Sequence, residues 1–134
     1  MEHFFSVIVG FIALSAIFIF FYFAPIGTWF AAKISGVRIT LLELFFMRLR
    51  KSPVTEIVNG LIMSAKAGVV LNRDQLEAHA KAGGNISNVV AGMISAKKAG
   101  ISLPFEKAAA LDFKGIKIPE VIKNELNSNT NHER

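Results

Sequence analysis

A long uncharged stretch opens the chain. From Phe4 to Ala32 no side chain carries a formal charge, and Lys33 ends the run. A lipid hydrocarbon core about 30 Å thick needs roughly 20 apolar residues to be crossed as a helix. Backbone groups inside lipid have no water to bond, so such a segment is expected to be helical. The pattern predicts a transmembrane anchor over residues 1–32.

Pro25 divides this anchor. A proline inside a helix removes a hydrogen bond and clashes with the preceding turn, so we expect the first span to end near Ala24. Residues 26–47 then form either a re-entrant second segment or an interfacial one, and the sequence leaves both open. A cleaved secretory signal fits poorly, because Met1-Glu2-His3 is not basic and no small-x-small site follows the apolar block.

A basic segment follows over residues 33–52. Thr40 and Glu43 have the spacing of a capping box, in which each side chain satisfies a backbone donor, so a short helix is predicted from Leu41 to about Arg50. This helix is more apolar than a soluble surface helix. We interpret it as a juxtamembrane helix that lies in the bilayer interface. Ser52 is typical of the cap that starts another helix.

The apolar positions of residues 53–126 recur at a spacing of 32 residues. In the first unit they follow the i, i+3, i+4, i+7 pattern of one helix face. These positions are Val54, Ile57, Val58, Leu61 and Ile62. The same face returns at Ile86 and, in part, at Ile118. Glycines just past the expected helix ends suit a left-handed backbone, and they are Gly68, Gly83, Gly100 and Gly115.

The predicted fold class is all-α. An N-terminal transmembrane helix is followed by a helical repeat domain, residues 53–126, of about two and a half helix-turn-helix repeats. Such units bury their apolar faces only by stacking on neighbours. Gly60 and Gly92 share one slot of the longer helices, where glycine costs about 1 kcal/mol relative to alanine. That shared slot indicates a close helix crossing, and Asn124 fills it in the third unit.

The last predicted helix, from Ile118 to about Asn127, has no shorter partner after it. We hypothesise that one face of the array is left incomplete and favours self-association or contact with the membrane. The residues that follow are polar, so a disordered tail is predicted over residues 127–134.

The charge of the chain is concentrated beside the anchor. The 134 residues carry a formal net charge of +5, and a group of five bases opposes Glu43 alone. These bases are Lys33, Arg38, Arg48, Arg50 and Lys51. Basic flanks mark the cytoplasmic side of a span, so the helical domain is expected in the cytoplasm. The five bases are predicted to contact lipid headgroups, with a pure topology signal as the alternative. A nucleic-acid partner is not expected, because no aromatic platform is interleaved with them.

Patterns of catalytic chemistry are missing from the sequence. There is no Cys, and no phosphate-binding loop, zinc motif or paired acid–base carboxylate is present. His3 and His132 lie near the chain ends, and His79 is interpreted as a solvated helix residue rather than a base or metal ligand. The sequence predicts a protein that is not an enzyme and uses no cofactor.

Several short strings carry a resemblance to a known family by their order and spacing. They are Gly36-Val37-Arg38-Ile39, Met47-Arg48-Leu49-Arg50, Ala65-Lys66-Ala67-Gly68, Asn72-Arg73-Asp74-Gln75-Leu76-Glu77-Ala78-His79, Ala82-Gly83-Gly84-Asn85, Phe105-Glu106 and Ala109-Ala110-Leu111-Asp112. Over about Pro25 to Val121 the chain resembles the amino-terminal part of the bacterial flotillin-like A proteins. The resemblance implies a non-catalytic scaffold in the bacterial plasma membrane that oligomerises and organises raft-like microdomains.

In that family this region leads into a band-7 type (SPFH) domain and a Glu/Ala-rich coiled coil, and we expect neither part here. The chain is interpreted as a short paralogue, a regulatory partner of a full-length scaffold, or a truncated product. The leading hypothesis is a scaffold or scaffold partner that forms homo-oligomers or hetero-oligomers with a full-length flotillin-like protein. The alternative is a small membrane-anchored adaptor whose helical domain binds a soluble client.

Overall fold

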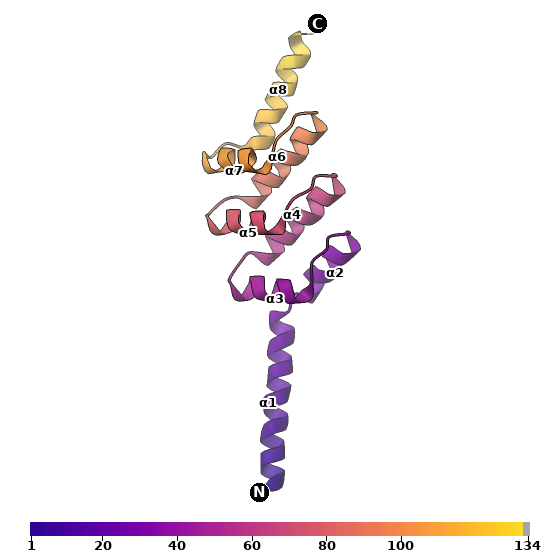
Figure 1. The fold of residues 1–134 in the computed structure, drawn as a ribbon, viewed down its shortest axis with the longest axis vertical. Coiled ribbons are helices and arrows are strands. Elements are labelled where there is room, and N and C mark those ends of the chain that lie inside the picture. The colour runs from indigo at the N-terminus through magenta and orange to yellow at the C-terminus, as the bar shows by residue number, and fades with distance from the viewer. Residues whose placement is uncertain (133–134) are drawn as a thin grey trace.

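The structure is a computed structural model that describes residues 1–132. Within this range the chain is all-α, as predicted, and forms eight helices. They are α1 (Glu2–Phe23), α2 (Ile26–Ile34), α3 (Leu41–Leu49), α4 (Val54–Lys66), α5 (Arg73–Lys81), α6 (Ile86–Lys98), α7 (Phe105–Phe113) and α8 (Ile118–His132). The molecule is elongated: α1 projects from one end, the other helices stack along the long axis, and α8 lies at the far end (Figure 1).

The first helix, α1, lies apart from the others. It is 22 residues long and buries none of its side chains. It is the one helix within residues 1–132 that is long and apolar enough to cross a membrane. Its last turn closes with a hydrogen bond from the Ala24 N–H to the Phe20 carbonyl, 2.8 Å long. Pro25 follows as the residue before α2, so the helix ends where the proline predicts.

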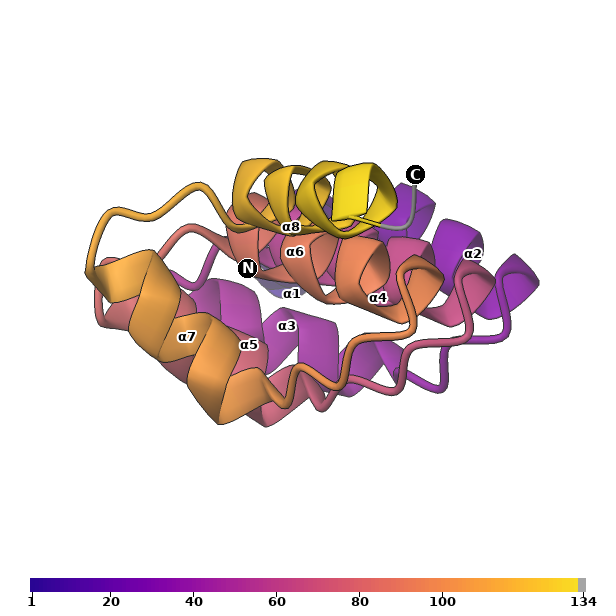
Figure 2. The ribbon, with the colours of Figure 1, turned by 90° about the horizontal axis from the view of Figure 1, so that it is seen from above.

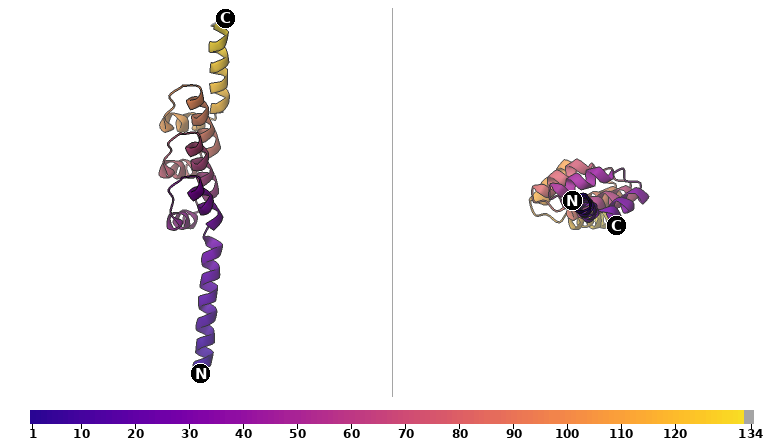
Figure 3. Two further views of the ribbon diagram at one scale, coloured as in Figure 1. Left: turned by 90° about the vertical axis from the view of Figure 1, so that its right-hand side faces the viewer. Right: turned by 90° about the horizontal axis from the view of Figure 1, so that it is seen from below.

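The remaining helices form two parallel rows. Seen from above, α2, α4, α6 and α8 lie over one another in one row, and α3, α5 and α7 lie in the other (Figure 2). Each helix of the first row packs on the next, α2 on α4, α4 on α6 and α6 on α8. The same stack is visible from the side (Figure 3).

The helix bounds keep one spacing along this stack. The helices α4, α6 and α8 begin at Val54, Ile86 and Ile118, which are 32 residues apart. The helices α3, α5 and α7 begin at Leu41, Arg73 and Phe105, again 32 residues apart. The α2–α3 pair, for which the sequence predicts an interfacial segment, therefore lies in the same series of positions as the pairs that follow it.

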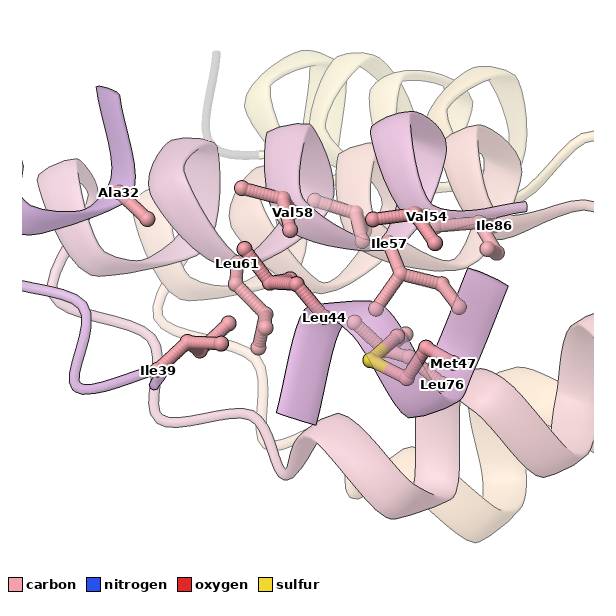
Figure 4. Packing of buried hydrophobic residues seen from close by; sticks show 11 residues of the cluster. Ala32, Ile39, Leu44, Met47, Val54, Ile57, Val58, Leu61, Leu76 and Ile86 are labelled. Atoms are coloured by element: carbon pink, nitrogen blue, oxygen red, sulfur yellow. The ribbon is translucent and has the colours of Figure 1, made fainter. Parts of the chain in front are cut away.

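Apolar side chains from four successive helices meet in a first core cluster. The predicted face of α4 points into it, and Leu44 and Met47 of α3 are fully buried there (Figure 4). Its buried members are Ala32, Ile39, Leu44, Met47, Val54, Ile57, Val58, Leu61, Leu76, Ile86 and Val90. Each fully buried aliphatic side chain contributes about 1.5–3 kcal/mol relative to exposure. The membrane-proximal pair α2–α3 is thus held to α4 by the core.

A second cluster joins α6, α7 and α8. Its buried members are Val89, Met93, Ala96, Ala108, Ile118 and Ile122. Because α6 contributes Val90 to the first cluster and Val89 to the second, the core continues along the stack through α6.

Local signals set the helix ends. The capping box of α3 is formed as predicted: the Thr40 N–H donates to Glu43 Oε2 at 2.9 Å, and the Glu43 N–H donates to Thr40 Oγ1 at 3.3 Å. The four glycines expected after helix ends have φ values of +70° to +86°, where a Cβ is disfavoured. Ser52 differs from expectation. Pro53 occupies the cap position of α4, and the Ser52 hydroxyl donates to Glu77 of α5 instead.

Two glycines allow the long helices to cross closely, as the sequence predicts. A Cβ on Gly60 of α4 would lie 3.1 Å from Ile86 Cγ2 and 3.2 Å from Val90 Cγ2 of α6. A Cβ on Gly92 of α6 would overlap the Ile118 side chain of α8. Asn124, in the corresponding slot of α8, is exposed.

The end of α8 differs from the sequence-based expectation. The polar pattern predicts fraying from residue 127, whereas α8 continues to His132. Side-chain hydroxyls reinforce the last turns: Ser128 donates to the Glu125 carbonyl at 2.9 Å, and Thr130 donates to the Leu126 carbonyl at 2.8 Å. Residues 133 and 134 of the predicted tail lie outside the described residues.

The close crossing at Gly92 predicts a specific mutational result. Alanine favours a helix over glycine by about 1 kcal/mol, but overpacking a well-filled contact costs about 1–3 kcal/mol. Gly92→Ala is therefore expected to lower the free energy of unfolding, measured by denaturant titration of the full chain in detergent. Gly27→Ala in α2, where a Cβ meets nothing within 4 Å, is the control. Equal or greater stability of Gly92→Ala would contradict the crossing.

Candidate membrane-facing site

Exposed apolar side chains gather on the α2–α3 pair, the part of the stack next to α1 (Figure 1). On α2 they recur every fourth residue, at Ile26, Phe30 and Ile34; we call this row the α2 stripe. On α3 they are Leu42, Phe46 and Leu49, the α3 stripe. Residues spaced by three or four lie on one side of a helix. Each helix thus buries one side in the core and presents another apolar side outward.

These stripes have a physical connection with α1. The Phe20 ring of α1 and the Phe45 ring of α3 lie 6.2 Å apart between centroids. An apolar patch that borders a membrane helix is a natural place for contact with the same lipid. The α2–α3 pair therefore has the composition of an interfacial layer while its inner side completes the first core cluster.

The five predicted headgroup residues all belong to this pair or its loops. Lys33 lies in the last turn of α2, and Arg48 lies in the last turn of α3. Arg38 lies in the loop between the two helices, and Arg50 and Lys51 follow α3. All five are exposed. The structure brings them into one layer, and their contact with lipid headgroups stays a prediction.

Arg50 differs from the other four because it has an internal partner. Its Nη2 lies 3.2 Å from Glu77 Oε2 of α5, and the Glu77 side chain is 8% exposed. The Ser52 hydroxyl donates to Glu77 Oε1 at 2.5 Å, and Lys81 Nζ lies 3.5 Å from the same oxygen. A buried carboxylate is tolerated when it is paired and hydrogen-bonded. Arg50 thus helps to fix the first pair to the second.

His79 is the clearest correction to the sequence-based interpretation. It is buried, not solvated, with 4% of the residue exposed. Its Nε2 lies 2.8 Å from Asp112 Oδ2 of α7, and its ring is 4.6 Å from the Phe113 ring between centroids. A Cβ on Gly84 would overlap the imidazole. The residue missed its correct assignment because Asp112 is remote in sequence and no local pattern announces the pair.

Asp112 is the centre of a network that joins four helices. The Asn85 N–H donates to Asp112 Oδ2 at 2.7 Å, and Asn88 Nδ2 donates to Asp112 Oδ1 at 2.6 Å. Asn88 also donates to the Ile116 carbonyl at 2.8 Å and accepts from the Ile118 N–H at 3.1 Å. The network therefore ties α5, the start of α6, α7 and the start of α8 together.

The Asp112 carboxylate is held in its ionised form. Burial alone would raise its pKa, but the hydrogen bonds from Asn88, Asn85 and His79 outweigh burial and hold the pKa of Asp112 below its ordinary value. Within residues 1–132 no group of three or more potential ligands is placed to hold a metal ion. We assign the network a structural role, because its donors and acceptors satisfy one another.

The fold and site define an all-α protein with one candidate membrane helix beside a basic, apolar layer. The family model described as "Flotillin-like protein FloA" matches residues 6–130, and the chain belongs to this flotillin-like family. The sequence resemblance is thereby confirmed.

Three relatives illustrate the match, each described as flotillin-like protein FloA. The protein of Parabacteroides distasonis is 43% identical over 110 residues, which are 81% of this chain and 33% of the relative. That of Alkaliphilus metalliredigens is 39% identical over 123 residues, 92% of this chain and 37% of the relative. That of Staphylococcus aureus strain N315 is 40% identical over 121 residues, 90% and 37%. The chain thus spans about a third of the length of these curated relatives. No solved structure matches it.

The depressed pKa of Asp112 predicts a pH dependence of stability. The ionised carboxylate contributes fully above the pKa of an unfolded Asp, about 3.9. This contribution is lost as the pH falls through the lower pKa of the folded state, because the unfolded chain then binds more protons. Asp112→Asn is expected to cost about 1–3 kcal/mol at pH 7 and to show a smaller further loss below pH 4 than the wild type.

Thermal unfolding of the full chain in detergent between pH 7 and pH 2 measures both effects. Glu56→Gln removes an exposed first-turn carboxylate of α4 and serves as the control. An Asp112→Asn profile parallel to that of the wild type would show that Asp112 does not carry this acid sensitivity.

Proposed function

We propose that the chain is a non-catalytic membrane scaffold, or the partner of one, that organises membrane microdomains through lateral self-association. The observation that carries the proposal is the continuity between α1, which is exposed along its whole length, and the apolar stripes of α2 and α3. A protein in water does not keep so much contiguous apolar surface uncovered. Membership of the flotillin-like family supports the same function.

We further propose that α1 spans the plasma membrane of a bacterium with the stack of helices on the cytoplasmic side. The residues before α1 include one acid and no Lys or Arg, whereas five bases follow within the α2–α3 pair and its loops. Lys and Arg flanks resist translocation and thereby set the orientation of a span.

We also propose that the stack is built from copies of one unit, and that α2–α3 is the first copy. The common spacing of the helix starts supports this, and so do the ends of α2, α4 and α6 at Ile34, Lys66 and Lys98, which are 32 residues apart. The pair that touches lipid is then the first unit of the array, fixed to the others by the core. A scaffold of this kind moves with the membrane as one body.

The far end of the stack is poorly suited to further stacking. Where α6 presents Met93 and Ala96 to α8, the equivalent positions of α8, 32 residues on, are Glu125 and Ser128, both exposed. A polar outer side is typical of the terminal unit of a repeat array. This argues against the hypothesis of an incomplete face that drives association. We therefore attribute lateral contacts to α1 and the α2–α3 pair.

Membrane anchoring by α1 is tested by extraction with alkaline carbonate. The wild-type chain is expected to stay with the membrane pellet. Leu14→Arg places a charge near the middle of α1 at a cost of about 2.5–3.5 kcal/mol and is expected to move a large share of the protein into the supernatant. Asn59→Arg, at an exposed position of α4, is the matched control. Release of the wild type itself would refute the anchor.

Lateral association is tested by crosslinking the full chain in bacterial membranes. Recovery of the chain itself, or of a full-length flotillin-like protein, in excess over other membrane proteins of equal abundance is the expected result. Recovery of neither would refute the scaffold. A single soluble protein recovered in stoichiometric amount, in place of both, would support the adaptor alternative.

A further inference from the structure

One groove of the α2–α3 pair combines an aromatic ring with two bases. Lys33 Nζ lies 4.8 Å from the centre of the Trp29 ring, one helical turn away on α2. The loop after α2 brings Arg38 to the same groove, which has a volume of about 770 Å³. Gly36, at φ +77°, turns the chain, and the Val37 N–H bonds the Ala32 carbonyl at 3.0 Å. The loop that carries Arg38 is therefore fixed by its own backbone.

The charge of this groove is not neutralised from within. Among the described residues, neither Lys33 nor Arg38 forms an ion pair, and both are exposed. Glu43, the acid that lines the groove, is engaged elsewhere: its Oε1 lies 2.8 Å from Arg73 Nη1 and its Oε2 accepts from the Thr40 N–H. The Thr40 N–H is the largest influence that holds the pKa of Glu43 below its ordinary value, and Arg73 adds to it.

The position of the groove relative to lipid follows from α2. Trp29 comes six residues after Phe23, the last residue of α1, and tryptophan is enriched at the level of the headgroups. Trp29 and Lys33 form the row beside the α2 stripe, since neighbouring residues of a helix are about 100° apart. A lipid whose acyl chains lie along the α2 stripe would carry its phosphate at this row.

We propose that the groove formed by Trp29, Lys33 and Arg38 binds the phosphate of an anionic phospholipid headgroup. This inference rests on the proposed membrane anchoring by α1. The Arg38 guanidinium matches two phosphate oxygens, Lys33 supplies a second charge, and the indole N–H of Trp29 is a further donor. The groove thus selects anionic lipid from the leaflet around α1, whereas Arg50 is engaged by Glu77.

The single tryptophan of the chain makes the groove directly observable. Trp29 is the only tryptophan, so its fluorescence reports this site alone. The full chain is reconstituted into vesicles of phosphatidylcholine with a fifth of phosphatidylglycerol. Bromine, a contact quencher, is placed near the glycerol end of the acyl chains of either one lipid or the other. Quenching per brominated lipid is then compared between the two preparations.

The expected result is quenching by the brominated anionic lipid that is roughly threefold or more stronger than by the neutral one. The double variant K33Q/R38Q is expected to quench equally with both. The double variant K107Q/K114Q removes the same charge from exposed positions at α7 and is expected to keep the preference. Circular dichroism confirms that both variants fold.

The other outcomes overturn the inference in distinguishable ways. Equal quenching of the wild type by both lipids refutes the groove and leaves the anchor intact, whereas no quenching by either refutes membrane insertion itself. Loss of the preference in K107Q/K114Q shows a general surface potential. Loss of the preference on adding inorganic phosphate, at an ionic strength matched with chloride, shows a site for free phosphate rather than for a lipid.

Discussion

The packing of α4 against both of its neighbours supports the rest of the structure. One side of α4 receives α2 and α3, and another receives α6 at the close crossing beside Gly60. Ile57 and Val58 are fully buried there. Without this contact the α2–α3 pair would have only its apolar stripes to position it, and it would be a flexible segment at the lipid surface. With it, the pair is both the base of the stack and the part nearest to the membrane.

Polar contacts fix the order in which the pairs stack. Glu77 and His79 lie two positions apart on α5, so they point to opposite sides of that helix. Glu77 reaches back to Arg50 and Ser52 after α3, and His79 reaches forward to Asp112 of α7. Apolar faces alone tolerate small shifts, whereas a buried polar group that loses its partner is costly. The two contacts therefore define the register of α5 with the pair before it and the pair after it.

Much of the fold follows from local signals in the sequence. The apolar face of α4, the capping box at Thr40 and the break at Pro25 were each predictable, because helix period, capping chemistry and proline geometry involve only residues close in sequence. The close crossings were predictable from Gly60 and Gly92, since a repeated glycine inside a helix needs a reason in packing. The chain's five juxtamembrane bases were also found by composition alone.

What the sequence did not predict depends on contacts between distant residues. Ser52 has the signature of a cap, yet its hydroxyl serves Glu77, which no local pattern reveals. His79 is surrounded in sequence by Glu77, Ala78 and Lys81, which indicates a solvated helix, and only α7 shows that it is buried. The α2–α3 pair was misleading for another reason. Its excess of apolar residues indicates an interface with lipid, and this hides the narrower face that packs on α4.

The two ends of the stack have opposite surface chemistry, and this asymmetry constrains how copies can associate. The end near α1 carries the apolar stripes and unpaired bases such as Lys33, whereas α8 presents Glu125 and Ser128 outward. Growth end to end would pair a lipid-compatible surface with a hydrated one and would leave both poorly solvated. Side-by-side association keeps every α1 in lipid and every α8 in water. In lipid, such contacts depend on close packing rather than on the hydrophobic effect, so the lipid held beside α2 becomes part of the surface through which neighbouring copies meet.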